Sequence, residues 1–340
     1  MPTMLVDLRS DTVTRPTAAM RQAMFDAEVG DDVYGEDPTV NRLQAAAAAL
    51  LGHEAGLFAP SGSMTNQIGI QLLVAPGEEL LLDSESHILA HEVGAAAVIG
   101  GISTRSWSSG GGRLDVSVVS ESVHESLAYH TVATRAIAVE NTHNRGGGTV
   151  IDIDQLRRLR ALADERGLLL HMDGARLWNA HVASGVPLAE YGRLFDTVSL
   201  CFSKGLGAPV GSVLVADAER IERARSIRKR MGGGMRQAGF LAAAANYALD
   251  HHINRLADDH VRARRLAEAL EPYGVTTAAG VETNIVLLRH PELGKLSAAA
   301  AEQGVLISVL GRDQGRLLTH LDISDDGVDH ALTVLTGLLR

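Results

Sequence analysis

From about Gln44 onward, short apolar segments alternate with longer amphipathic segments. The short segments have the length and apolar character of buried strands, and the longer ones carry the caps and i,i+4 charge pairs of helices. The predicted strands are residues 56–59, 79–83, 102–107, 135–140, 168–172, 197–202 and 212–216. Buried strands that alternate with helices form sheets covered on both faces, so we expect an α/β fold with a mostly parallel seven-stranded sheet.

Two further parts flank this region. Residues 1–43 are polar and turn-rich without a core pattern, which is typical of an arm packed on another surface. After helices expected near 237–249 and 254–270, a smaller α+β portion follows, with strands expected at 283–288, 305–309 and 317–321. Because single cores stop growing near ~250–300 residues, we predict separate domains. They are an N-terminal arm at 1–43, a large domain at 44–250 and a small C-terminal domain at 251–340.

Charge and composition exclude several classes of protein. The formal net charge is −10 and the longest basic run spans only residues 228–230, which argues against nucleic acid as a partner. No apolar run reaches the ~18 residues of a membrane span, and Asp7, Arg9 and Asp11 interrupt any early signal-like segment. The single cysteine, Cys201, cannot form an intramolecular disulfide, so we expect a cytoplasmic protein.

Two residues that follow predicted strands point to a cofactor. Ligands of open parallel sheets bind beyond the carboxyl ends of the strands. Lys204 follows the strand at 197–202 and precedes Gly205, and Asp173 follows the strand at 168–172. Either residue alone is more simply a loop lysine or a turn acid. Together they match pyridoxal phosphate (PLP), which needs a lysine to form a Schiff base and an acid to keep its pyridine nitrogen protonated.

The turns after two other strands fit the same cofactor. Gly62 and Ser63 lie between a strand and the helix that follows it, where free backbone amides favour a phosphate group. His87 begins the helix after the next strand, where its ring could stack on the pyridine, move protons or cap the helix. His87 and His91 also have the i,i+4 spacing of metal ligands. They lack a suitable glutamate and a third ligand, so we predict no metal and keep zinc as an alternative.

Longer stretches of this chain resemble the low-specificity L-threonine aldolases, which are PLP enzymes of fold type I, the aspartate-aminotransferase-like fold. The similar segments run from end to end in the family order. They are DLRSDTVTRPT at 7–17, VGDDVYGEDPTVN at 29–41, ENTHN at 140–144, HMDGARLWNA at 171–180, FSKGLGAPVGS at 202–212, GGGMRQAG at 232–239 and LLTHLD at 317–322.

The resemblance implies a set of cofactor-binding residues. They are Gly62, Ser63, His87, Asp173, Arg176, Lys204, Lys229 and Arg236. Within this set, Lys204 forms the internal aldimine, Asp173 pairs with the pyridine nitrogen and Arg176 contacts the ring hydroxyl oxygen. Lys229 and Arg236 approach the phosphate from a neighbouring subunit. With an N-terminal arm that carries a site residue, this implies a homo-oligomer with composite active sites, either an obligate dimer or a tetramer built as a dimer of dimers.

The resemblance also implies a substrate and a reaction. Ser10 and Arg316 bind the carboxylate of an amino acid, and His130 lies near its hydroxyl group. The implied activity is retro-aldol cleavage of L-threonine, L-allo-threonine and related β-hydroxy-α-amino acids to glycine and an aldehyde. The catalytic residues are then Lys204, Asp173, His87 and His130, and the base is either histidine or a water held by them.

Three positions depart from the family pattern. Ser63 stands where Thr is common, Trp178 where Phe is usual, and His91 where an aromatic residue is expected. The last two affect either the substrate side-chain pocket or helix packing. A β-elimination on the same fold remains the nearest alternative reaction, followed by a zinc-dependent hydrolase and, last, a non-enzymatic binding module.

Overall fold

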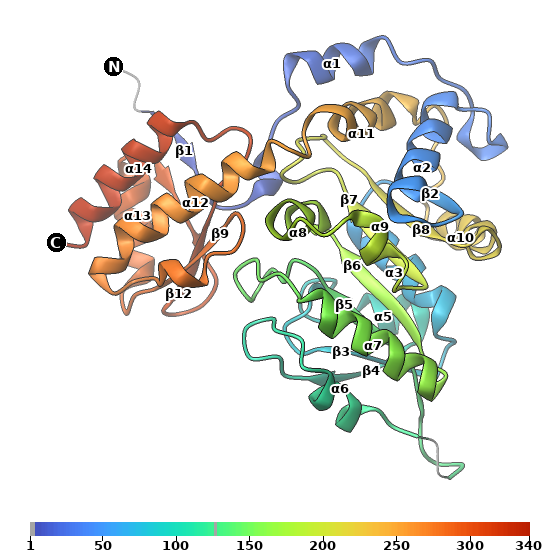
Figure 1. Cartoon of the computed structure of the whole chain (residues 1–340). Coiled ribbons are helices and arrows are strands. Elements are labelled where there is room, and N and C mark those ends of the chain that lie inside the picture. The colour runs from blue at the N-terminus through green and yellow to red at the C-terminus, as the bar shows by residue number, and fades with distance from the viewer. Residues whose placement is uncertain (1–3, 126–127) are drawn as a thin grey trace.

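The computed structural model describes residues 4–125 and 128–340, and a seven-stranded sheet dominates it (Figure 1). The strand order is β2–β8–β7–β6–β5–β3–β4. The strand β8 runs opposite to the other six, so its pairs with β2 and β7 are antiparallel and the other four pairs are parallel; the prediction of a mostly parallel sheet is confirmed. The strands are β2 (Ala55–Ala59), β3 (Glu79–Asp83), β4 (Ser103–Trp107), β5 (Thr134–Glu140), β6 (Leu169–Gly174), β7 (Thr197–Cys201) and β8 (Ser212–Ala216).

Helices cover both faces of this sheet (Figure 1). Their ends follow local sequence signals: α2 begins at Pro38 after Asp37, whose carboxylate accepts from the amides of Thr39 and Val40, and it ends at Gly52 in the left-handed conformation. The helices before the C-terminal unit are α1 (Ala18–Phe25), α2 (Pro38–Leu51), α3 (Gly62–Leu73), α4 (His87–Ala90), α5 (Ala95–Gly100), α6 (Val116–Ser122), α7 (Ile153–Arg166), α8 (Leu177–Ser184), α9 (Leu188–Gly192), α10 (Ala218–Arg230) and α11 (Gly239–His251), with short 3-10 turns η1 (Asp11–Val13) and η2 (Asp32–Tyr34).

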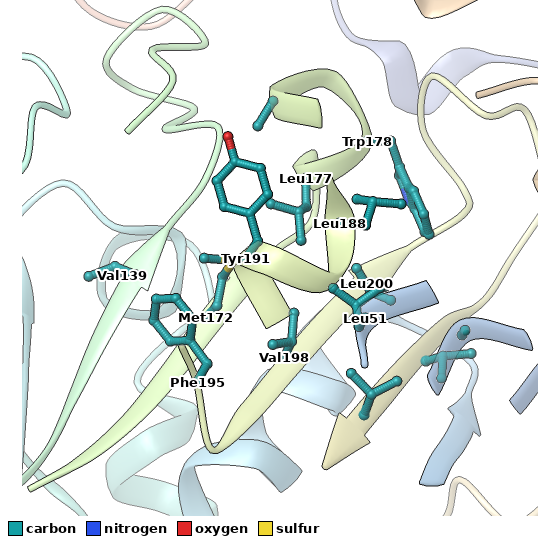
Figure 2. Packing of buried hydrophobic residues seen from close by; sticks show 14 of the residues in the cluster. Leu51, Val139, Met172, Leu177, Trp178, Leu188, Tyr191, Phe195, Val198 and Leu200 are labelled. Atoms are coloured by element: carbon teal, nitrogen blue, oxygen red, sulfur yellow. The ribbon is translucent and has the colours of Figure 1, made fainter. Parts of the chain in front are cut away.

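One face of the sheet packs its aliphatic side chains against α8 and α9. Figure 2 shows Met172, Val198 and Leu200 of β6 and β7 lying beneath Tyr191 and Trp178. The indole Nε1–H of Trp178 donates to the carbonyl of Cys201 at 3.0 Å, and its ring packs on Phe202. Of the two roles left open for Trp178, the structure supports helix packing.

The C-terminal unit has its own core and includes the start of the chain. Val6 and Leu8 are buried in this core, and β1 (Val6–Asp7) pairs in parallel with β10 (Val305–Leu306). The remaining elements are β9 (Ile285–Arg289), β11 (Ser308–Val309), β12 (Gln314–Leu318), α12 (Leu256–Leu270), α13 (Leu293–Glu302), α14 (Asp325–Leu338), η3 (Glu271–Tyr273) and η4 (Ala278–Gly280). The predicted domain boundaries stay a prediction.

Two strand predictions in this unit were wrong in their bounds. The strand expected at 317–321 is β12, which begins at Gln314 because it pairs antiparallel with β9, and Gln-Gly-Arg carries no apolar signal of a strand. After Leu318 the backbone turns toward the N-terminal segment, since the Leu318 amide donates to the Leu8 carbonyl at 2.8 Å. The strand expected at 305–309 is divided between β10 and β11.

Within the described ranges, no helix has the length and apolar character needed to cross a bilayer.

Candidate active site

The carboxyl ends of three parallel strands bring the predicted cofactor residues together. Asp173 on β6 is in register with Glu140 on β5 and with Ser199 on β7. Lys204 follows β7 and is half-buried. Its carbonyl accepts from the hydroxyl of Thr14 at 2.9 Å and from the amide of Gly207 at 2.8 Å, which fixes the backbone that carries the lysine.

Asp173 is a buried and ionised acid. Its Oδ2 accepts from Asn66 Nδ2 at 2.8 Å, and its Oδ1 accepts from the amide of Ala175 at 3.1 Å. Burial alone would raise its pKa, but the charges of His87 and Lys204 and the Asn66 hydrogen bond outweigh burial and lower the pKa. A carboxylate that keeps its charge is suited to pairing with a protonated ring nitrogen.

The first turn of α3 fits a phosphate group. Ser61 caps this helix by accepting from the Met64 amide, and Gly62 and Ser63 provide the first free amides. The hydroxyl of Ser212 is buried beside this turn, 3.5 Å from the position that a Cβ on Gly62 would occupy, and it has no partner among the described residues. An unpaired hydroxyl next to a helix N-terminus is a donor set for an anion, so these residues fit the phosphate of PLP.

His87 is held by two carboxylates. Glu140 Oε2 accepts from the backbone amide of His87 at 2.7 Å, and Glu140 Oε1 accepts from the amide of Asn144 at 2.9 Å. The ring Nδ1 of His87 lies 3.0 Å from Glu92 Oε1. Burial disfavours charge on His87, but Glu92 and the nearby Asp173 outweigh it, so the pKa of His87 is raised. Sequence reasoning missed Glu92, because nothing in the Gly- and Ala-rich segment around it suggests a buried acid.

Ligand atoms of His87, Glu92 and Asp173 lie within 4.8 Å of one another, a spacing that suits a metal ion. Asn66 Nδ2 donates to both carboxylates, and Gln67 donates to the second oxygen of Glu92. Carboxylate oxygens that already accept these amide hydrogens are less available as ligands for a cation. The zinc alternative with His91 is also weakened, because His91 Nε2 accepts from Arg145 Nε at 3.2 Å.

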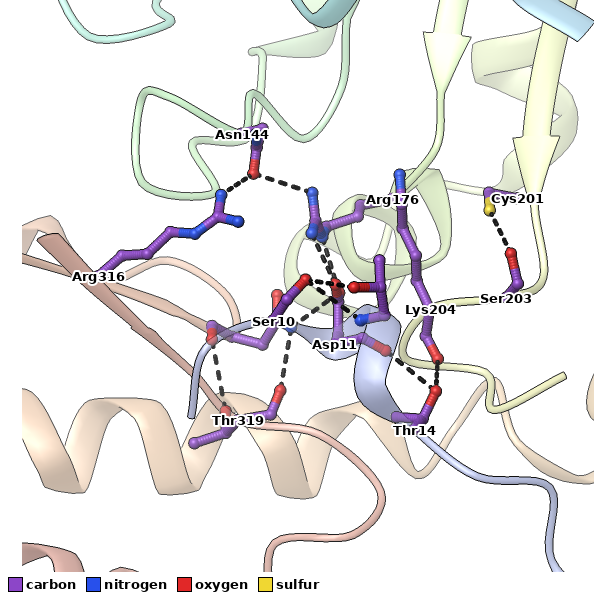
Figure 3. Close-up of polar contacts among 12 residues, drawn as sticks. Ser10, Asp11, Thr14, Asn144, Arg176, Cys201, Ser203, Lys204, Arg316 and Thr319 are labelled. Atoms are coloured by element: carbon purple, nitrogen blue, oxygen red, sulfur yellow. Dashed lines mark hydrogen bonds and ion pairs between the residues drawn. The ribbon is translucent and has the colours of Figure 1, made fainter. Parts of the chain in front are cut away.

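A chain of polar contacts links Arg316 to Arg176 (Figure 3). Asn144 Oδ1 accepts from Arg316 Nη1 at 2.5 Å and from Arg176 Nη1 at 3.2 Å. Arg176 is bound in turn by both oxygens of Asp11, at 2.6 and 2.7 Å, with both side chains buried. Burial and the neighbouring Arg176 charge lower the pKa of Arg316 to about 10, so the guanidinium stays charged at neutral pH. The sequence reading missed Asp11 because it lies in a polar turn.

Ser10 lies beside this network, and three other expected residues are exposed. Ser10 caps η1 next to Asp11 (Figure 3). His130 is exposed and precedes the amino end of β5, opposite the edge where Glu140 lies. Lys229 and Arg236 are exposed; Arg236 pairs with Asp31, and Lys229 has no ion pair with a described residue. Within the described ranges, no hydrogen bond or ion pair links the side chains of these three residues to Lys204, so their roles at the site stay a prediction.

Fold and site together define a PLP-dependent enzyme of fold type I. A model of the beta-eliminating lyase family matches residues 7–292. The chain is 42% identical over 339 residues to the probable low-specificity L-threonine aldolase 2 of Arabidopsis thaliana, covering 96% of this chain and 95% of that protein. The chain belongs to the beta-eliminating lyase family and, within it, to the low-specificity L-threonine aldolases.

Solved structures share the fold at low sequence identity. A Leishmania major threonine aldolase superposes with a TM-score of 0.83 at 22% identity, covering 98% of this chain and 100% of that one. A structure of SPT with PLP superposes with a TM-score of 0.74 at 16% identity, covering 98% and 87%. These likenesses agree with the fold predicted from the alternating strands and helices.

Proposed function

We propose that this chain cleaves the Cα–Cβ bond of L-threonine, L-allo-threonine and related β-hydroxy-α-amino acids, giving glycine and an aldehyde. One observation carries the proposal: the guanidinium of Arg316, which can bind a carboxylate, is connected to Lys204 by polar contacts. These contacts run through Asn144, Arg176 and Asp11 to the segment that binds the Lys204 carbonyl. An amino acid bound there has its carboxylate at Arg316 and its amino group toward the lysine.

Binding of the substrate carboxylate decides which bond breaks. The guanidinium of Arg316 can bind a carboxylate with two parallel hydrogen bonds. This fixes rotation about the bond between Cα and the amino nitrogen. When bound, PLP supplies an electron-withdrawing ring that accepts the electron pair released at Cα. Asp173 would pair with its ring nitrogen, Lys204 would bind its aldehyde carbon, and the α3 turn would hold its phosphate. Positioning and electrostatics then account for most of the acceleration.

Proton transfer from the substrate hydroxyl falls to His87 in this proposal. Loss of the β-hydroxyl proton turns Cβ–OH into the carbonyl of the aldehyde as the Cα–Cβ bond breaks. His87 lies near Asp173 and Lys204 and has a raised pKa, so cleavage should rise with pH through a value above the usual one for histidine. His130 is a second candidate base if another subunit supplies it.

The test is product analysis with Lys204→Ala as the control. Wild-type protein loaded with PLP should convert L-threonine to glycine and acetaldehyde, and Lys204→Ala should lose both this turnover and the absorbance of the bound imine. Full turnover by Lys204→Ala would refute the assignment of the lysine.

The family description favours one alternative reaction, β-elimination, which releases ammonia and an oxo acid. Both reactions use the same cofactor residues and differ in which bond to the substrate breaks. Assaying glycine plus aldehyde against ammonia plus oxo acid, with threonine, serine and cysteine as substrates, separates them directly.

We also propose a cytoplasmic homotetramer, a dimer of dimers, with composite sites. Beside the α3 turn, an open groove of about 590 Å³ is lined by Ser63, Val93 and Ile99. Val93 is 94% exposed and Val98 84% exposed, which suits burial against a second copy. A second copy there could supply Lys229, Arg236 and His130 to the site.

Subunit mixing tests the composite site. Lys204→Ala and Arg236→Ala proteins should each lose most activity alone and regain about a quarter of wild-type activity after subunit exchange, because half of the dimers are then mixed and each mixed dimer holds one intact site. No recovery in oligomers shown by mass spectrometry to be mixed would contradict shared sites.

A further inference from the structure

Glu92 is a buried carboxylate. Neither its position relative to the predicted strands nor the family resemblance gives it a role. Its side chain is fully buried, and each of its oxygens accepts an amide hydrogen: Oε1 from Asn66 at 2.9 Å and Oε2 from Gln67 at 2.7 Å. Its remaining contact is the ring Nδ1 of His87, 3.0 Å from Oε1. Burying an acid costs free energy unless its hydrogen-bond partners are well placed. We therefore expect Glu92 to have a role in function.

Neighbouring groups fix the orientation of Asn66. Burial lowers the pKa of His171 to about 4, so this ring is neutral at physiological pH. His171 Nδ1 contacts the Thr197 hydroxyl, and its Nε2 lies 3.2 Å from Asn66 Oδ1. Since Asn66 Oδ1 accepts from His171, both hydrogens of Asn66 Nδ2 are available, one for Asp173 and one for Glu92.

The hydrogen-bond directions then fix the tautomer of His87. An ionised carboxylate only accepts, so the contact between Glu92 and His87 requires a hydrogen on Nδ1. In neutral His87 the lone pair is therefore on Nε2. Other charged groups around this ring are Asp173 on β6, Lys204 after β7, His91 at the end of α4, and Glu140 on β5, which binds the His87 amide.

We propose that Glu92 is the positioning residue for proton transfer by His87. It keeps hydrogen on Nδ1, leaves Nε2 to take the β-hydroxyl proton, and stabilises the imidazolium that forms; the proton can then return to Cα to complete glycine. The relation is that of the aspartate and histidine in a serine-protease triad. This inference rests on the proposed retro-aldol function. Asn66 extends the hydrogen-bond network by joining Glu92 to Asp173, the acid proposed to pair with the cofactor ring.

Glu92→Gln tests the inference, with the exposed Glu121→Gln as a matched control. The glutamine keeps the size of the side chain, removes its charge and can present a hydrogen to Nδ1. We expect kcat to fall about 100-fold or more with KM changed less than about threefold, because general-base catalysis contributes 10²–10⁴-fold. The acid limb of the pH profile should move to lower pH because His87 loses its charge partner. Glu121→Gln should match wild type.

A double variant separates positioning from a general structural effect. If Glu92 acts through His87, then His87→Asn with Glu92→Gln should be no slower than His87→Asn alone. Multiplied losses would overturn the proposal, as would a Glu92→Gln enzyme with wild-type kcat and an unmoved acid limb. If Glu92→Gln does not fold or bind PLP, the comparison uses Glu92→Asp, which keeps the charge and should keep the acid limb; a displaced limb would contradict the proposal.

Nuclear magnetic resonance of protein labelled with ¹⁵N-histidine gives a readout that does not depend on turnover. Wild-type His87 should show the Nδ1–H tautomer, and Glu92→Gln should lower its pKa by about one unit or more. An Nε2–H tautomer in wild type would overturn the proposal. If wild type releases no aldehyde yet shows this tautomer and shift, the proposed reaction fails while the coupling of Glu92 to His87 stands.

Discussion

Asp11→Asn removes the charge that balances Arg176, and the structure gives the size of the effect. Asp11 is 0% exposed and Arg176 5% exposed, and they form two hydrogen bonds of 2.6 and 2.7 Å. Breaking a buried pair by removing one charge costs about 3–5 kcal/mol, because the other charge stays buried and unpaired. The cost should lie toward the upper end, since Arg316 shares Asn144 with Arg176 and adds a second positive charge.

The assay is urea unfolding at fixed protein and PLP concentrations, because both subunit association and ligand binding shift apparent stability. At a slope of about 3 kcal/mol per M, the midpoint should fall by roughly 1 M or more. Glu292→Gln, in an exposed pair with Lys295, is the control and should leave the midpoint nearly unchanged. An Asp11→Asn midpoint equal to that of the control would refute the reasoning, since Arg176 would then need no counter-charge.

The same variant predicts a pH dependence. Burial would raise the pKa of Asp11, but Arg176 and Lys204 outweigh burial and lower it well below its usual range. A lowered folded-state pKa contributes stability that is fully present above the unfolded value and is lost as pH falls toward the folded value. The gap between wild type and Asp11→Asn should therefore be constant above about pH 5 and shrink below about pH 4.

Two further substitutions test the substrate fork and the core. Arg316→Lys keeps the charge and loses the planar fork, so KM for L-threonine should rise about 10–100-fold with the absorbance of bound PLP unchanged; an unchanged KM would remove Arg316 from the carboxylate site. Trp178→Phe loses the hydrogen bond to the Cys201 carbonyl, so unfolding free energy should fall by about 1–2 kcal/mol while the ratio of L-threonine to L-allo-threonine turnover stays constant. A changed ratio would return Trp178 to the substrate pocket.

Residues that follow parallel strands could be predicted because topology alone brings them together. Once the strands before Asp173 and Lys204 are assigned as neighbours, their carboxyl ends must meet at one edge of the sheet. Gly62 and Ser63 follow from the helix start in the same way. Each of these predictions needs only local patterns and one rule of sheet geometry.

Asp11, Glu92 and Asn66 could not be found by such rules. Asp11 meets Arg176 across 165 residues of sequence, and Asn66 meets Asp173 across 107. Neither residue has a periodic pattern around it that marks it as buried, and both gain their role from a partner that the fold supplies. Long-range polar pairs of this kind depend on side-chain packing, and predicting strands and helices from sequence patterns gives no information about that packing.

The segment at residues 8–14 explains why the active site depends on both cores. Leu8 is buried in the C-terminal core, and its carbonyl accepts from the Leu318 amide, so this segment belongs to the C-terminal unit. Six residues further on, the Thr14 hydroxyl donates to the carbonyl of Lys204, which follows the central sheet. Asp11, between them, joins Arg176 to Asn284 of the C-terminal unit. Because the counter-charge of Arg176 comes from this segment, the complete site forms only when both cores are folded and in contact.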